Sequence, residues 1–313
     1  MATLLYTHPA CLDHVAGRGH PESPERLKAI LAALEAPEFA GLIRREAPRA
    51  ELALIERVHP ADFVERQLAA VPRTGFAMID GDTVLSPGSG EAALRAAGAL
   101  CAAVDAVMAG EGDNAFCAVR PPGHHAEPSQ AMGFCLFNNV AIGALHARRA
   151  HGCGRVAVVD FDVHHGNGTQ AAFERDATLF FASTHQSPLY PGTGAASERG
   201  VDNIVNVPLR PGAGSAEFRH AYGEIILPAL HDFQPDFVLI SAGFDAHRAD
   251  PLASLMLTEE DFAWVTREIL RLAKSSCAGR VVSTLEGGYD LPALAASAAA
   301  HVGALIAAGR GSP

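Results

Sequence analysis

The sequence predicts an α/β protein in which helices cover both faces of a parallel β-sheet. Short apolar segments typical of buried strands recur along the chain, and several run directly into glycine and polar residues. Helical patterns lie between these segments, and this alternation is typical of parallel sheets. Ligands of such sheets bind beyond the carboxyl ends of the strands. We therefore expect the functional residues to gather at one rim of the sheet.

The composition fits a single globular domain over residues 1–313. The chain is 49% hydrophobic and 19% charged, a balance that argues against disorder. Its formal net charge of -11 disfavours nucleic acid as a partner. The six cysteines are scattered without a Cys-x-x-Cys pair, so we expect neither a thiolate zinc cage nor a disulfide framework.

No segment of the chain is expected to enter a membrane. The N-terminal residues 1–8 lack a basic region followed by a long apolar run, so we expect no signal peptide. The most apolar segment, 291–308, is mostly alanine and contains Ser297 and His301, which favours a packed helix over a membrane span. These features predict a soluble, cytoplasmic protein.

The first third of the chain predicts one strand and three helices. A short strand is expected at 4–6, and the loop that follows at 11–22 looks too polar for the core. Ser23 and Pro24 begin a helix well, because serine is a favourable N-cap and proline fits the first turn. Further helices are expected near 60–70 and 91–109, and a loop at 80–90 containing Asp80 and Asp82 lies between them.

The rest of the chain alternates between expected strands and helices. Each strand is a short apolar segment that ends at glycine or polar residues, and each helix shows a helical pattern of apolar positions. The expected strands are 116–119, 156–159, 178–182, 237–240 and 281–285, and the expected helices are 138–151, 215–233, 258–273 and 291–308.

The segment from Val156 to Thr169 is the most informative in the chain. Four apolar residues, three of them β-branched, are followed by Asp160, Asp162 and His164 at alternate positions. Alternate side chains of a strand share a face, so these three are expected to converge where the strand ends. Two carboxylates and an imidazole suit a divalent metal such as zinc. Charges so close to an apolar strand need a partner, which disfavours the alternative of a surface turn.

Polar residues after three other strands are expected to complete the site. Asp245 would add a metal ligand and leave one coordination position open, as in catalytic metal sites, although such a residue could also cap a helix. The adjacent His124 and His125 suit proton transfer. Tyr289, after Gly287 and Gly288, could donate to an oxyanion, although it could also pack on a turn.

Six motifs in order resemble the zinc-dependent histone deacetylase family, and in particular its class II-like bacterial amidohydrolases. The resemblance covers nearly the whole chain and implies the arginase/deacetylase fold, with about eight parallel strands between two layers of helices. It rests on these segments: Arg120-Pro-Pro-Gly-His-His-Ala126, Gly133-Phe-Cys-Leu-Phe-Asn-Asn139, Asp160-Phe-Asp-Val-His-His-Gly-Asn-Gly-Thr169, Pro191-Gly-Thr-Gly194, Ala242-Gly-Phe-Asp245 and Leu285-Glu-Gly-Gly-Tyr289.

The resemblance also implies a role for each site residue. One catalytic zinc would be held by Asp162, His164 and Asp245, and metal-activated water would hydrolyse the amide. The resemblance assigns proton transfer to His124 and His125, their orientation to Asp160 and Asn167, polarisation of the scissile carbonyl to Tyr289, and substrate binding to Gly133, Phe134, Tyr190, Leu252 and Gly287.

One or two structural potassium ions are implied as well. The first would lie against Asp160, Asp162, His164, Ser183 and Thr184. The second would lie near Phe173, Asp176, Leu179 and Asn203.

Three functions stay open at this point. The first is removal of acyl groups from lysine side chains or similar primary amines, and the second is hydrolysis of acetylpolyamines. The acidic net charge slightly favours the second, whereas the apolar Leu252 after Asp250-Pro251 favours acyl-lysine. The third, a non-catalytic binding protein, is disfavoured because every expected catalytic residue is present. The sequence leaves an oligomer possible.

Overall fold

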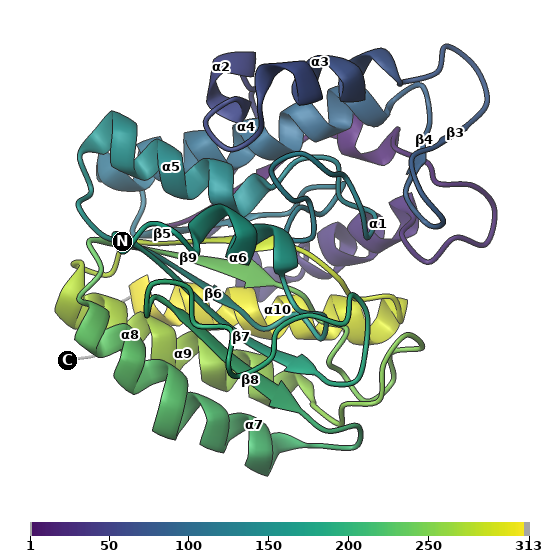
Figure 1. Ribbon diagram of the computed structural model, residues 1–313. Helices are drawn as coiled ribbons and strands as arrows, with labels where there is room; N and C mark the ends of the chain where they lie inside the picture. Colours follow the sequence, from purple (N-terminus) through teal and green to yellow (C-terminus); the bar gives the residue numbers. More distant parts are fainter. Residues whose placement is uncertain (1, 310–313) are drawn as a thin grey trace.

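The centre of the structure, a computed structural model that describes residues 2–309, is an eight-stranded sheet in which all neighbouring strands are parallel (Figure 1). This confirms the expected fold class. The strand order is β2-β1-β5-β10-β9-β6-β7-β8. The strands are β1 (Thr3–Thr7), β2 (Ile43–Glu46), β5 (Asn114–Cys117), β6 (Val156–Asp160), β7 (Leu179–Gln186), β8 (Ile204–Leu209), β9 (Phe237–Ala242) and β10 (Val281–Leu285).

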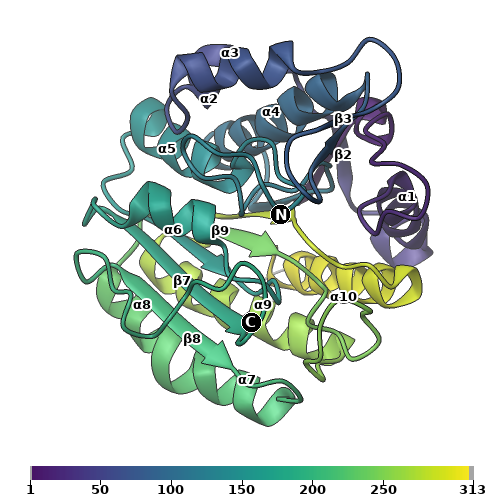
Figure 2. The ribbon, with the colours of Figure 1, turned by 45° about the vertical axis from the view of Figure 1, so that its right-hand side comes forward.

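Helices cover both faces of this sheet. The long helices α4 and α5 pack together on one face, and α9, α10 and α1 pack on the other (Figure 1). Figure 2 shows α7 and α8 along the outer strands β7 and β8. The helices are α1 (Pro24–Ala33), α2 (Leu52–Ile55), α3 (Ala61–Ala69), α4 (Ser89–Met108), α5 (Asn139–His151), α6 (Asn167–Phe173), α7 (Ser215–Ala221), α8 (Leu227–Phe233), α9 (Glu259–Ser276) and α10 (Leu291–Gly309).

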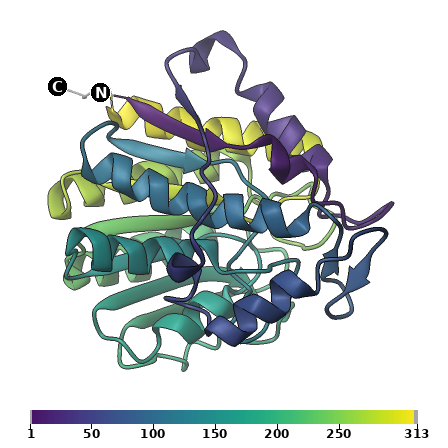
Figure 3. The same cartoon turned by 90° about the horizontal axis from the view of Figure 1, so that it is seen from above.

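Three shorter segments complete the fold. Two 3₁₀ turns, η1 (Pro9–Leu12) and η2 (Pro37–Phe39), lie before and after α1. An antiparallel hairpin of β3 (Ala77–Met78) and β4 (Val84–Leu85) lies at one edge of the molecule (Figure 3). The turn of this hairpin carries Asp80 and Asp82.

Local sequence explains both ends of α5. The Asn138 side chain accepts a hydrogen bond from Ala141 N (3.0 Å) at the start of α5, and Gly152 ends that helix in the left-handed conformation. The helix expected at 215–233 contains a π-helical turn, η3 (Tyr222–Ile226), between α7 and α8. Pro228 follows this turn and has no amide hydrogen to donate, which explains the change in helical geometry.

The structure differs from the expectations in several places. Strands β2, β3, β4 and β8 and helices α2 and α6 were not expected from the residues, and β5 lies two residues earlier than expected, at Asn114–Cys117. The 11–22 loop is partly core, because Glu22 is fully buried and pairs with Arg26 and Arg120. This buried ion network ties the loop to the strand end that follows β5.

Helix α10 packs inside the fold as expected. Of the helices in the described part of the chain, it alone has the length and composition to cross a membrane. It packs against α9 and α1, and Leu294, Val302 and Leu305 are buried in the core. Its buried His301 contacts the hydroxyl groups of Thr266 (2.7 Å) and Ser283 (2.8 Å), which links α10 to α9 and β10.

Candidate active site and metal centre

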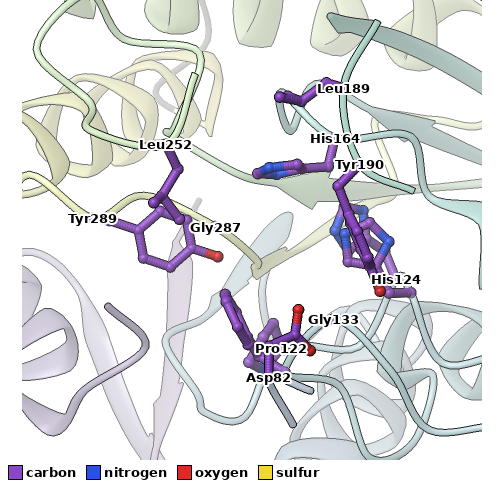
Figure 4. A pocket seen from close by; sticks show the side chains of 12 residues that line it. Asp82, Pro122, His124, Gly133, His164, Leu189, Tyr190, Leu252, Gly287 and Tyr289 are labelled. Carbon is purple, nitrogen blue, oxygen red and sulfur yellow. The ribbon is translucent and has the colours of Figure 1, made fainter. Parts of the chain in front are cut away.

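A cavity of about 210 Å³ opens at the carboxyl ends of the central strands (Figure 4). It collects residues from segments that lie far apart in the sequence. Its lining includes most of the catalytic and substrate-binding residues expected from the sequence, together with residues that were not expected. The lining residues are Asp82, Pro122, His124, His125, Gly133, Phe134, His164, Leu189, Tyr190, Leu252, Gly287 and Tyr289.

The three expected metal ligands converge at this cavity. One ligand atom each from Asp162, His164 and Asp245 lies within 4.8 Å of the others, and all three residues are buried. The His164 Nδ1 atom is 3.1 Å from Asp162 Oδ1 and 3.1 Å from Asp245 Oδ2. Strand β6 ends at Asp160, so Asp162 and His164 belong to the loop after the strand rather than to the strand itself.

The surroundings of this cluster fit a metal cation. Burial and the neighbouring Asp162 carboxylate raise the pKa of Asp245 to about 7. Two buried carboxylates so close together are the donor set that a bound cation would compensate. Gly287 donates its backbone N–H to Asp162 Oδ2 (2.7 Å). A Cβ atom at Gly287 would lie 2.0 Å from Asp245 Oδ2, so only glycine fits there.

Each histidine of the pair is oriented by the expected partner. His124 Nδ1 lies 2.9 Å from Asp160 Oδ2, and His125 Nδ1 lies 2.8 Å from Asn167 Oδ1. Burial lowers the pKa of His124, but the carboxylates of Asp160 and Asp162 outweigh it and raise the pKa well above its usual value. Burial, with the adjacent His124, lowers the pKa of His125 well below its usual value. The two rings are therefore suited to different proton-transfer roles.

Glu286 fixes the loop that carries these histidines. Its buried carboxylate accepts hydrogen bonds from Gly123 N (2.7 Å), His124 N (3.2 Å) and the Ser241 hydroxyl (3.2 Å). Burial raises the pKa of Glu286 to about 7. Glu286 was not expected at the site from the sequence. A charged side chain at the end of an apolar strand was the available signal.

Tyr289 is held from both sides and points its hydroxyl toward the centre of the cavity (Figure 4). Asp250 Oδ2 accepts a hydrogen bond from Tyr289 N (2.7 Å). The Arg26 guanidinium lies 4.8 Å from the centre of the Tyr289 ring and donates to Gly288 O (2.6 Å). Burial raises the pKa of Tyr289 well above its usual value, so its hydroxyl stays a hydrogen-bond donor.

Comparison with known proteins decides the family. The histone deacetylase domain model matches residues 20–305. The chain is 42% identical to histone deacetylase 14, chloroplastic, of Arabidopsis thaliana, over 97% of this chain and 77% of that protein. It is also 42% identical to a histone deacetylase-like amidohydrolase of Pseudomonas aeruginosa, over 88% of this chain and 74% of that protein. The crystal structure of the HDA15 HD domain superposes with a TM-score of 0.93 at 36% identity and covers 98% of this chain and 88% of that one.

The chain belongs to the histone deacetylase family. Members of this family are zinc-dependent hydrolases of acetylated amines, and this protein is a hydrolytic deacetylase. The comparisons confirm the resemblance and the arginase/deacetylase fold. They also favour an enzyme over the non-catalytic binding protein that the sequence left open.

The deacetylase cavity has the apolar walls expected for a substrate tunnel. Phe134 packs edge-on against Tyr289, with ring centres 5.9 Å apart, and Tyr190 packs against His125 at 5.1 Å. Gly133 has a positive φ of 56°, and a Cβ atom there would lie 2.5 Å from the His125 ring. Leu252 and Gly287 also line the cavity, so the structure brings all five expected substrate-binding residues together.

Asp82 is a carboxylate at the deacetylase cavity that was not assigned to the site from the sequence. Burial and the neighbouring Asp80 raise the pKa of Asp82. Its backbone carbonyl lies 3.0 Å from His20 Nε2. Because it comes from the β3–β4 turn, no strand-end pattern pointed to it.

The residues expected around two potassium ions form two clusters. In the first cluster, Asp160 of β6 is paired with Ser183 of β7, and the Tyr222 hydroxyl donates to Asp160 O (3.4 Å). On the second, the Asn203 amide nitrogen lies 2.9 Å from Phe173 O, 3.1 Å from Asp176 O and 2.7 Å from Leu179 O. These distances put the nitrogen where a cation bound to the three carbonyls would lie. The second group therefore does not fit a bound potassium ion.

A further carboxylate–histidine group lies between α4 and α5. The Nε2 atoms of His146 and His151 are each 2.6 Å from Asp105 Oδ1. Arg57 donates to His146 Nδ1 (2.9 Å), so the proton of that ring is on Nε2 and faces the carboxylate. This arrangement ties the two helices together without leaving His146 Nε2 free to bind a metal.

Proposed function

We propose that this deacetylase removes acyl groups from lysine side chains, with one zinc ion held by Asp162, His164 and Asp245. The observation that carries the proposal is the convergence of this cluster, a histidine pair and a tyrosine hydroxyl on one apolar-walled cavity. A zinc ion bound there would polarise the acyl carbonyl and lower the pKa of a water molecule.

The side chains of the cavity supply the remaining chemistry. Tyr289 donates its hydroxyl proton in a hydrogen bond to the acyl oxygen and stabilises negative charge as it develops there. His125 accepts a proton from the attacking water at Nε2, and a protonated histidine of the pair returns a proton to the leaving amine. Water adds a C–O bond and the amide C–N bond breaks, so the products are a carboxylic acid and a free amine.

The walls of the cavity suit a lysine side chain. Phe134 and Tyr190 offer aromatic surface to an aliphatic stem, and the Gly133 carbonyl could accept a hydrogen bond from the amide N–H. These side chains also exclude water from the reacting groups, which strengthens electrostatic interactions inside the cavity.

A second candidate substrate class is the acetylated polyamine, and Asp82 is the observation that favours it. A carboxylate at the cavity offers a counter-charge to the distal ammonium groups of such a substrate. Leu252, which lines the same cavity, offers none.

We also propose one structural potassium ion, at the first of the two expected clusters. Asp160 at the end of β6, Asp162 and His164 in the loop after it, and Ser183 and Thr184 in β7 would supply its oxygen ligands, beside the zinc site. Such a cation would offset the buried carboxylates of this region.

A substrate panel with the zinc-loaded enzyme tests the proposal. It would compare acetyl-lysine peptides, longer acyl-lysines, N-acetylputrescine and N8-acetylspermidine, each with wild type and Tyr289→Phe. We expect acyl-lysine to give the highest kcat/KM, and Tyr289→Phe to lower kcat by roughly 10²–10³-fold with zinc retained. Equal kcat in the two proteins, or no hydrolysis of any member of the panel, would contradict the proposal.

A further inference from the structure

The partner of His125 has a partner of its own. Asn167 Oδ1 lies 2.8 Å from His125 Nδ1, and Asn167 Nδ2 lies 2.7 Å from Glu127 Oε1. Asn167 is buried at the start of α6, and Glu127 is half-buried in the loop after the histidine pair. A backbone bridge between Glu127 and Gln130 holds this loop. The three side chains form a chain that runs away from the cavity.

Elementary hydrogen-bond chemistry fixes the direction of this chain. An ionised carboxylate only accepts hydrogen bonds, so the Asn167 group that faces Glu127 is the amide nitrogen. The amide oxygen then faces His125, whose Nδ1 must carry the proton. The other ring nitrogen, Nε2, is left with a free lone pair, and it is the atom that can accept a proton.

Without Glu127, only weak contacts would fix the orientation of the Asn167 side-chain amide. The other groups near Asn167 Nδ2 are His125 O and Met132 Sδ, both at 3.4 Å and therefore weak acceptors. An amide turned by half a rotation would present its nitrogen to His125 Nδ1 and move the ring proton to Nε2. His124 needs no such device, because its partner Asp160 is itself a carboxylate.

We propose that Glu127 is a positioning residue that sets the tautomer of His125 through Asn167. This inference rests on the proposed function, in which His125 accepts a proton at Nε2. Glu127 does not line the cavity, and it acts on the reaction only through Asn167. A residue with a purely structural role would not change which nitrogen of His125 is protonated.

The tautomer can be read directly by NMR of zinc-loaded enzyme labelled with ¹⁵N-histidine. We expect Nδ1 of His125 to be protonated in wild type and in Glu127→Gln, whose amide oxygen can still accept from Asn167. In Glu127→Lys the ammonium group attracts the Asn167 oxygen, and the His125 proton should move to Nε2. We expect kcat to fall by roughly 10- to 100-fold with KM changed less than about two-fold. Glu65→Lys, an exposed charge reversal on α3, is the matched control.

A double substitution distinguishes the loss of the Glu127–Asn167–His125 hydrogen bonds from a general loss of structure. In Glu127→Lys/Asn167→Asp, the carboxylate at position 167 can accept from both neighbours, so the Nδ1 tautomer and most of kcat should return. Glu127→Ala serves if the lysine variant does not fold, and it should give a mixed tautomer with a smaller loss of kcat. An unchanged tautomer and kcat in Glu127→Lys or Glu127→Ala would overturn the inference. If wild type hydrolyses no acylated amine, the proposed function fails, but the NMR spectra still decide whether Glu127 sets the tautomer.

Discussion

At the scale of single residues, Asp245 illustrates how the site depends on groups from different strands. Asp162 and His164 follow β6, whereas Asp245 follows β9, the neighbouring strand. The Asp245 Oδ1 atom accepts a hydrogen bond from Val163 N (2.8 Å), and its Oδ2 atom faces His164. One carboxylate therefore both orders the loop after β6 and completes the donor set.

Removal of this carboxylate should release the metal. In Asp245→Ala, three ligands become two, and we expect the purified protein to lose most of its zinc. Elemental analysis after dialysis against a weak chelator measures the remaining zinc. Asp62→Ala, an exposed aspartate on α3, is the control and should keep full occupancy. Stoichiometric zinc in Asp245→Ala would show that the ligands lie elsewhere.

Asp82 and Leu252 should determine substrate preference in opposite ways. Asp82→Asn removes the carboxylate at the cavity, so kcat/KM for N8-acetylspermidine should fall relative to acetyl-lysine peptide by roughly 3- to 10-fold. Leu252→Glu adds a carboxylate and should raise the same ratio by roughly ten-fold. Added salt should shrink both effects, because the mouth of the cavity is open to solvent. A ratio that does not move in either variant would place the selectivity in another loop.

At the scale of the elements, Asn203 ties three segments together. It stands just before β8, and its amide donates to carbonyls at the end of α6, in the following turn and at the start of β7. Its Oδ1 atom accepts from Val201 N (3.1 Å), so both ends of the amide are satisfied. The neutral Asn203 amide therefore binds the three carbonyl oxygens that were expected to bind the second potassium ion.

Asn203→Asp tests this interpretation with an isosteric change. The new carboxylate would face three carbonyl oxygens, and an unpaired buried charge should lower the free energy of unfolding by about 3 kcal/mol in choline chloride. Potassium chloride should restore part of this loss if the cation can bridge the carboxylate and the carbonyls. Urea unfolding in the two salts measures both quantities, with wild type as the reference. Crystallographic detection of Tl⁺ between these carbonyls in wild type would contradict the interpretation.

The strands of the main sheet that could be predicted from the sequence are buried, whereas β2, β8 and α6, which could not be predicted, are exposed or lack an apolar pattern. Strands such as β6 and β9 are buried on both faces, so their apolar runs are unambiguous. The edge strand β2, Ile43–Glu46, is mostly exposed and carries two arginines and a glutamate, so no apolar pattern marks it. Strand β8 contains Asn206 and Pro208, and α6 lies inside a glycine-rich motif that looks like a loop.

More of the candidate site than of the outer strands and helices could be predicted from the sequence. Residues at strand ends, such as Asp162, His125 and Tyr289, were expected to meet because parallel strands end at one rim. Residues that reach the site from segments other than strand ends were not predicted. Glu127 and Asp82 belong to loops whose path depends on tertiary contacts, and neither shows periodicity that could place it beside the cavity.

At the scale of the whole molecule, buried neutral histidines link stability to pH. Burial lowers the pKa of His59 and of His185 to about 4 and that of His301 to about 3. His59 lies between Pro128 O (3.1 Å) and Asn138 N (2.9 Å), so its neutral ring connects two loops. His59 and His301 each join segments that are distant in the sequence, whereas His185 bonds Ser183 within β7 and the nearby Gly194 O.

The sign of this linkage follows from the depressed pKa values. An unfolded histidine binds a proton near pH 6.5, whereas these folded rings stay neutral until the pH approaches 4 or 3. The stabilisation is complete above the unfolded pKa and is lost as the pH falls toward the folded pKa. A shift of this size corresponds to roughly 3 kcal/mol or more for each ring at neutral pH.

His301→Gln should therefore weaken the dependence of stability on pH. Below pH 6 each such ring contributes a slope of about 1.4 kcal/mol per pH unit to the free energy of unfolding. Urea unfolding at pH 7.0, 6.0, 5.5 and 5.0 should give a slope for His301→Gln that is smaller than that of wild type by about this amount. His231→Gln, the same substitution at an exposed histidine, is the control. An unchanged slope in His301→Gln would mean that His301 is protonated in the folded protein and that its contacts with Thr266 and Ser283 do not hold it neutral.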